Sequence, residues 1–195
     1  MNFGKICVFC GSNSGIDPEY KNAAERMGQL LASSGIELVY GAGNVGLMGV
    51  LADAVMSAGG HVTGIIPEAL MAKEVGHTGI SDLRVVKSMH ERKALMSDLS
   101  DGFIALPGGF GTFEEFCEVL TWSQLGIQSK PCGLLNVKGY YDPLLQLFDH
   151  AVEQGFLRKE NRHLVLDDSD PETLLRKMAA FRPIPADKWI WKVER

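Results

Sequence analysis

The sequence predicts an α/β fold with a doubly wound, mainly parallel sheet that carries helices on both faces. Short apolar runs alternate with helical patterns along the whole chain. The helical patterns space their apolar residues three and four apart, as at Ala23, Met27, Leu30 and Leu31. Strands that alternate with helices are joined by right-handed crossovers, which build a parallel sheet covered on both sides. This arrangement is typical of a Rossmann-like single domain.

Seven runs are predicted as strands because they are short, apolar and bounded by turn residues. In chain order they are Lys5–Cys10, Glu37–Tyr40, His61–Ile66, Leu83–Val86, Gly102–Leu106, Cys132–Val137 and His163–Leu166. Three helices are predicted to begin at Asp-Pro pairs, with the aspartate as the cap and the proline as the first helical residue. These pairs begin at Asp17, Asp142 and Asp170.

The composition excludes several classes of protein. Of 195 residues, 46% are apolar and 22% are charged, which suffices for a packed core. The net charge of −5 argues against a broad surface for nucleic acid or for anionic membranes. The first residues enter a strand directly, without the pattern of a signal peptide, so we expect a cytoplasmic protein.

Cys7 and Cys10 form a C-x-x-C pair that could indicate redox chemistry or a metal site. Both lie in a predicted strand, where residues three apart point to opposite faces, so we expect two buried structural thiols. The five histidines are scattered and match no zinc-binding pattern. We therefore expect no structural zinc site.

We predict one domain over residues 1–181, followed by a tail over 182–195. The tail holds Trp189 and Trp191, which we expect to pack on the parent domain or on a second subunit. Within the domain, the stretch from Met71 to Ser81 contains two glycines and is predicted to be a mobile loop.

Three strand-to-helix turns are rich in glycine, and they point to a ligand site. They span residues 10–15, 41–46 and 107–112. In a parallel sheet these turns lie at the carboxyl ends of the strands, where such folds bind ligands. Glycine lets backbone amides approach a bound group, and the helix that follows adds free N–H groups and partial positive charge. We therefore expect a crevice for a nucleotide or phosphate, with Gly11, Ser12 and Gly43 among its residues.

The second turn, Gly41-x-Gly43-x-x-Gly46, also matches the dinucleotide-binding fingerprint. However, it follows the second strand, and the acid near the expected distance, Glu68, follows a proline and heads the next helix. A nicotinamide-dependent oxidoreductase is therefore the weaker alternative.

Two capping-box patterns place charged residues at helix starts. Ser88 and Glu91 predict a helix from Met89, which brings Arg92 and Lys93 into its first turn. Cations there oppose the helix dipole, so either solvent or a phosphate or carboxylate compensates them. Thr112 and Glu115 predict a second box, with Glu115 at the third helical position. A carboxylate there could position water or stabilise a cationic transition state.

Three motifs together resemble the LOG ("lonely guy") family. They are Gly46-Leu47-Met48-Gly49, Met89-His90-x-Arg92-Lys93 and Pro107-Gly108-Gly109-x-Gly111-Thr112-x-x-Glu115. Members of this family are cytokinin riboside 5′-monophosphate phosphoribohydrolases, and bacterial members are similar to AMP nucleosidases. Some have carried a lysine decarboxylase label, although no pyridoxal site is visible here. The family often has glycine where this chain has Ala42, which bears only on local loop geometry.

The resemblance implies a role for each matching residue. Arg92 and Glu115 match the catalytic pair. The positions matching nucleotide or ligand contacts are Glu74, Lys93, Gly109, Phe110, Gly111, Thr112, Phe113, Glu114 and Thr121. Members are usually homodimers with sites near the subunit interface, and the expected chemistry calls for no metal or organic cofactor.

The expected reaction is hydrolysis of the N-glycosidic bond of an adenosine 5′-monophosphate, with or without an N6-prenyl group. It releases the free base and ribose 5-phosphate. A nucleotide-binding or carrier protein of similar fold, without catalysis, is the first alternative, and an NAD(P)-dependent oxidoreductase is the second.

Overall fold

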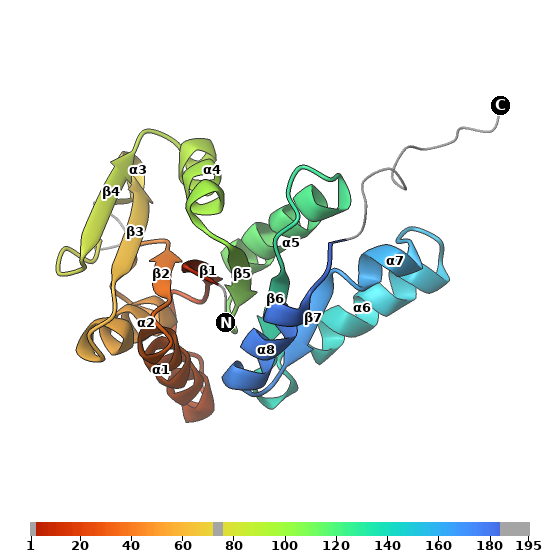
Figure 1. Cartoon of the computed structure of the whole chain (residues 1–195), viewed down its shortest axis with the longest axis horizontal. Helices are drawn as coiled ribbons and strands as arrows, with labels where there is room; N and C mark the ends of the chain where they lie inside the picture. Colours follow the sequence, from red (N-terminus) through yellow and green to blue (C-terminus); the bar gives the residue numbers. More distant parts are fainter. Residues whose placement is uncertain (1–2, 72–75, 184–195) are drawn as a thin grey trace.

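The computed structural model describes residues 3–71 and 76–183, and it contains a single seven-stranded sheet (Figure 1). The spatial order is β4-β3-β2-β1-β5-β6-β7, and all the strand pairs are parallel. This confirms the predicted doubly wound α/β fold, because the order reverses at β1. The strands are β1 (Lys5–Phe9), β2 (Glu37–Tyr40), β3 (Val62–Pro67), β4 (Asp82–Val86), β5 (Gly102–Ala105), β6 (Cys132–Leu135) and β7 (Val165–Asp168).

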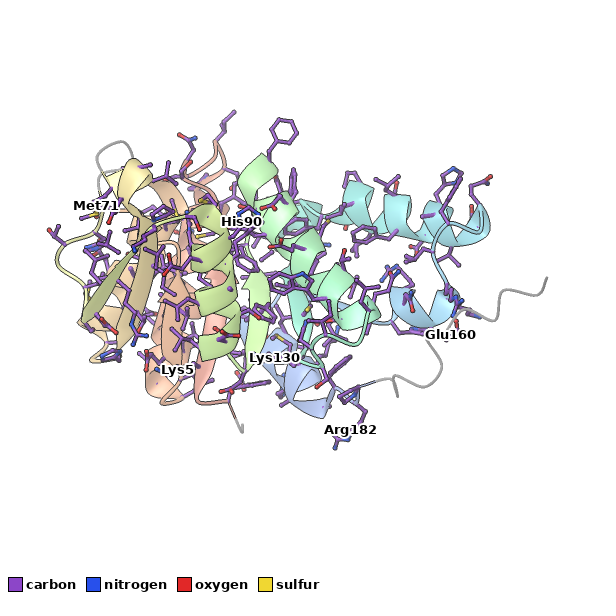
Figure 2. All side chains as sticks on the ribbon, turned by 90° about the horizontal axis from the view of Figure 1, so that it is seen from above. Lys5, Met71, His90, Lys130, Glu160 and Arg182 are labelled. Carbon is purple, nitrogen blue, oxygen red and sulfur yellow. The ribbon has the colours of Figure 1, made fainter. Side chains whose placement is uncertain are left out.

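Helices cover both faces of the sheet, as Figure 1 shows, and Figure 2 views the molecule from the side of α4 and α5. They are α1 (Pro18–Ser33), α2 (Gly46–Ser57), α3 (Glu68–Met71), α4 (Met89–Leu99), α5 (Phe110–Gln124), α6 (Asp142–Glu153), α7 (Lys159–Arg162) and α8 (Pro171–Ala180), with a 3-10 turn, η1 (Val137–Gly139). One apolar core packs α1, α2 and α8 against the sheet. The other lies between the sheet and α4, α5 and α6. Strand β1 serves both cores, because its side chains alternate between them.

All the predicted strands are confirmed; the ends of β1 to β5 agree within one residue, and the larger shifts are in β6 and β7. β6 ends at Leu135 rather than at Val137, because the chain turns there into η1, where Lys138 has a φ of 55°. β7 begins at Val165 rather than at His163, because His163 and Leu164 close the short helix α7 through bonds to Glu160 and Asn161.

Two of the three predicted aspartate caps are confirmed. Asp17 accepts a hydrogen bond from the Glu19 amide at 2.9 Å, and Asp170 accepts one from the Thr173 amide at 2.8 Å. The prediction for Asp142 is wrong, because α6 begins at Asp142 itself. Its carboxylate instead accepts a bond from Asn136 at 2.7 Å, which braces the preceding turn.

The tail predicted from residue 182 lies largely outside the described residues, as do both of its tryptophans, so the domain boundary stays a prediction. The described part of the Met71–Ser81 stretch is tied to the rest of the chain. Gly76 forms a bridge with Gly43, and the His77 amide donates to the Ala42 carbonyl at 2.9 Å. None of the helices in the described ranges combines the length and apolar character that crossing a bilayer requires.

Candidate active site

The three glycine-rich turns meet at the carboxyl edge of the sheet. They follow β2, β1 and β5, which are neighbours. The Gly11 amide donates to the Pro107 carbonyl at 3.0 Å, which joins the first turn to the third. The Leu47 amide donates to the Gly11 carbonyl at 3.0 Å, which joins the second turn to the first. The turns therefore form one rigid backbone surface beside the point where the strand order reverses, as a ligand crevice in this fold requires.

A cavity of about 200 Å³ opens between the first and third turns. Its lining includes Gly11, Ser12, Asn13, Ser14, Leu47, Gly108 and Gly109, with Tyr20 and Tyr140 as its aromatic wall. The two rings meet edge to face at 5.7 Å between centroids. The Tyr140 hydroxyl donates to the Gly108 carbonyl at 2.5 Å and so braces the third turn. Neither tyrosine was singled out from the sequence, because no local pattern shows which turn a distant aromatic residue will contact.

The predicted capping box at Thr112 is wrong, and the correction bears directly on ligand binding. Helix α5 begins at Phe110 with Gly109 as its cap, and no described side chain caps it. Its first helical hydrogen bond runs from the Phe113 amide to the Gly109 carbonyl at 3.1 Å. The preceding amides, on Phe110, Gly111 and Thr112, therefore have no partner within the helix and present donors beside the cavity.

Gly108 is required by close packing within the third turn. A β-carbon there would lie 2.1 Å from the Thr112 hydroxyl oxygen and 2.9 Å from the Gly11 nitrogen. Gly108→Ala is therefore expected to lower the free energy of unfolding by about 1–3 kcal/mol, measured by urea denaturation. Gly109→Ala is the matched control, because a β-carbon at Gly109 meets nothing within 4 Å. Equal stability of the two variants would contradict this packing.

Arg92 and Glu115, which lie far apart in the sequence, are brought together by α4 and α5. The Arg92 Nη2 atom lies 3.7 Å from Glu115 Oε1, and their side chains are only 7% and 14% exposed. The Nε atom of Arg92 is buried and has no hydrogen-bond partner among the described residues. A buried guanidinium with an unmet donor is costly. A ligand with oxygen acceptors would relieve that cost.

The pair lies next to the cavity but does not line it. Gly46 packs so closely on Ser12 that a β-carbon would fall 2.2 Å from the Ser12 carbonyl carbon. Gly41, at the other end of the same turn, packs against the Arg92 guanidinium. Thr112 is buried beside Gly108, and Glu115 lies one turn further along the same face of α5. The second turn and the first part of α5 thus connect the cavity to the pair.

Lys93 is compensated by carboxylates in this structure. Its Nζ atom lies 2.7 Å from Glu114 and 2.9 Å from Glu118, and both partners belong to α5. Burial alone would lower the pKa of Lys93, but its hydrogen bonds to the two carboxylates outweigh burial, and the net pKa is raised. The ammonium group therefore stays charged and joins α4 to α5 beside the Arg92–Glu115 pair.

The helix start that carries these cations is confirmed. Ser88 caps α4 and accepts a bond from the Glu91 amide at 3.1 Å. The Glu91 carboxylate accepts a hydrogen bond from the Lys87 amide at 2.9 Å, whereas in a standard capping box it would accept one from the Ser88 amide.

The cysteine pair is structural, as predicted. Cys7 and Cys10 belong to the two different cores and are free thiols. Burial, and then the nearby negative charge of Glu115, raise the pKa of both thiols. Because the reactive form of cysteine is the thiolate, neither is suited to redox chemistry.

The three glycines of the second turn are packed against other parts of the chain: Gly41 against Arg92, Gly43 against Met48, and Gly46 against Ser12. Ala42 has a φ of 59°, in the left-handed region that favours glycine. Glycine adopts this conformation without strain, so it suits the position at which this chain departs from the family pattern.

Several predicted contact residues lie apart from the pair. Thr121 is exposed and lies about 18 Å along α5 from Gly109, at about 1.5 Å rise per residue. It borders a separate cavity of about 150 Å³ between α5, α6 and α7. Phe110 is 92% exposed at the tip of α5, whereas Phe113 packs edge to face on Tyr141. Glu74 lies outside the described residues.

Comparisons with known proteins agree with these motifs. Residues 48–178 match the family model described as "Possible lysine decarboxylase". The chain is 53% identical over 179 residues to "Probable cytokinin riboside 5'-monophosphate phosphoribohydrolase LOGL1" of Oryza sativa subsp. japonica, covering 92% of this chain and 80% of the relative. It is 47% identical over 196 residues to "Cytokinin riboside 5'-monophosphate phosphoribohydrolase LOG1" of Arabidopsis thaliana, covering 99% and 92%.

Solved structures share the fold at lower identity. The molybdenum cofactor binding protein of Rippkaea orientalis is 23% identical, with a TM-score of 0.67 over 92% of this chain and 98% of that one. The molybdenum cofactor carrier protein of Chlamydomonas reinhardtii is 19% identical, with a TM-score of 0.67 over 91% and 98%. At these identities the likeness establishes the Rossmann-like architecture alone. The family model and the close relatives establish that this chain belongs to the LOG family of cytokinin riboside 5′-monophosphate phosphoribohydrolases.

Proposed function

We propose that this protein hydrolyses the N-glycosidic bond of a nucleoside 5′-monophosphate whose base is adenine or an N6-prenylated adenine. The products are the free base and ribose 5-phosphate. The observation that carries the proposal is the buried Arg92–Glu115 pair, 3.7 Å apart, beside a helix start without a side-chain cap. The names of the close relatives support the same reaction.

The reaction passes through a sugar with oxocarbenium character, as glycoside hydrolysis does in general. The bond between C1′ and the base nitrogen breaks, water adds its oxygen to C1′, and the departing base gains a proton. Glu115 supplies a fixed negative charge that stabilises the cationic sugar or orients the water. Arg92 holds Glu115 in place or binds the oxygens of the ribose.

The phosphate anchors the substrate at the first turn of α5. The amides of Phe110, Gly111 and Thr112 would donate to its oxygens, with partial positive charge from the helix start. Gly11 and Ser12 face the same cavity. Binding energy gained at the phosphate then places C1′ at the catalytic pair, which lowers the barrier by positioning.

Thr121 and the surface around it suggest how subunits associate. Large apolar side chains are exposed at the C-cap of α5, on α6 and in the loops that follow these helices: Leu125, Ile127, Leu147 and Phe156. We propose that this edge forms the interface of a homodimer, with Thr121 acting at the interface rather than within one subunit's own crevice. A cytoplasmic location is also proposed, because four free thiols suit a reducing compartment.

The decisive experiment is incubation with AMP followed by chromatography. We expect adenine and ribose 5-phosphate to appear in equal amounts, at a rate proportional to protein concentration. Saturable AMP binding without release of base would favour the carrier alternative. Saturable binding of NAD or NADP, again without release of base, would favour the oxidoreductase. A parallel assay with isopentenyl-AMP would show which base is preferred.

A further inference from the structure

We propose that Gly41 is a positioning residue for this hydrolysis. Because glycine has no side chain, the Arg92 guanidinium lies directly against the backbone at position 41, and in this position it faces Glu115. The inference rests on the proposed function and adds a residue from the second glycine turn, which otherwise has no part in the chemistry. It also explains why glycine begins that turn.

The evidence is the closeness of the guanidinium to the backbone. A β-carbon on Gly41 would lie 2.1 Å from Arg92 Nη2, 3.2 Å from Cζ and 3.8 Å from Nε. The first distance is far shorter than a van der Waals contact, so the guanidinium and any side chain at position 41 exclude one another. Nη2 is also the atom that lies 3.7 Å from Glu115. A side chain on Gly41 would therefore displace the nitrogen that faces the catalytic carboxylate.

The backbone at Gly41 cannot retreat to relieve such a clash. Tyr40, the residue before it, pairs with Val8 on β1 and with Gly64 on β3, in the interior of the sheet. Ala42, the residue after it, is buried and accepts the hydrogen bond from the His77 amide. Gly41 is thus held from both sides. Its φ is not positive, so alanine can adopt the same backbone conformation.

Helix α4 is held as firmly as the turn. The Ser88 cap fixes its first turn, and the ion pairs of Lys93 with Glu114 and Glu118 join it to α5. Within residues 3–71 and 76–183, the other polar contact of the Arg92 guanidinium, Nη1 to the Met89 sulfur at 3.9 Å, is weak. A methyl group on Gly41 is therefore expected to rotate the guanidinium away from Glu115 and to leave the two backbones in place.

The test is Gly41→Ala, assayed for AMP hydrolysis. We expect kcat to fall on the order of 100-fold, the loss typical of a displacement of about 1 Å in a catalytic group. We expect KM to change little, because the phosphate-binding amides of α5 are untouched. Gly133→Ala is the matched control: it adds a methyl group to a buried glycine of β6, 3.0 Å from Leu174 and Met178, and we expect wild-type kcat.

A double-mutant cycle with Arg92→Ala separates positioning from general damage. If Gly41 acts through Arg92, then adding Gly41→Ala to Arg92→Ala should change kcat by no more than about twofold. A 100-fold further loss in that background would overturn the proposal. Unchanged kcat for Gly41→Ala alone would overturn it as well.

Folding provides a second readout. Should Gly41→Ala fold poorly, the added Arg92→Ala change is expected to restore the urea midpoint, because it removes the clashing group. Continued instability of the double variant would count against the proposal. Failure of the proposed function itself would look different, because the wild-type protein would then release no base from AMP. In that case the urea midpoints of the single and double variants would still report the contact between Gly41 and Arg92.

Discussion

Replacing Glu115 by glutamine is expected to lower kcat for AMP hydrolysis on the order of 1000-fold, with nucleotide binding retained. Glutamine keeps the shape of the side chain and removes its charge. The carboxylate is largely buried beside Arg92, in surroundings where a fixed charge acts strongly on a developing oxocarbenium ion. Steady-state kinetics would give kcat, and isothermal titration calorimetry with AMP would give the affinity.

Glu118→Gln is the matched control for this experiment. Glu118 lies one turn beyond Glu115 on α5, and it is ion-paired to Lys93, which keeps Glu114 as a second partner. We expect kcat for Glu118→Gln to stay close to the wild-type value, because partly exposed ion pairs contribute little individually. Near wild-type turnover by Glu115→Gln would show that the carboxylate is not needed for the chemistry.

Removing the phosphate from the substrate is expected to have an effect of similar size. Adenosine should show a kcat/KM lower than that of AMP by on the order of 1000-fold, because it loses the contacts that hold C1′ at the pair. The loss should appear in kcat as well as in KM, since the phosphate acts by positioning. Ribose 5-phosphate, which keeps the anchor, should inhibit AMP hydrolysis competitively. Equal kcat/KM for the two substrates would mean that the glycine turns hold no phosphate.

Local patterns were sufficient to predict most of the fold. The short apolar run of Lys5–Phe9 and the aspartate caps at Asp17 and Asp170 depend on neighbouring residues only, and these elements were predicted within a residue. The errors arose where contacts between residues distant in the sequence determine the local structure. Asp142 was misassigned because Asn136 binds its carboxylate, a contact that no helix-capping pattern contains.

The site was less predictable for the same reason. The start of α5 was misplaced by a capping box that fits Thr112 and Glu115, although Gly109 is the cap and the helix begins at Phe110. The partners of Lys93 lie 21 and 25 residues further along the chain, so the sequence alone could not distinguish carboxylate from phosphate as its counterion. The space at Gly41 exists only once β2 and α4 are packed together.

A crystal structure of the Glu115→Gln variant with AMP bound would show whether one nucleotide reaches both the start of α5 and the Arg92–Glu115 pair. We expect the phosphate to contact the amides of Phe110, Gly111 and Thr112. We expect C1′ to lie between the Arg92 guanidinium and the side chain at position 115. AMP bound elsewhere, or with its C1′ out of reach of both side chains, would refute the proposed mechanism.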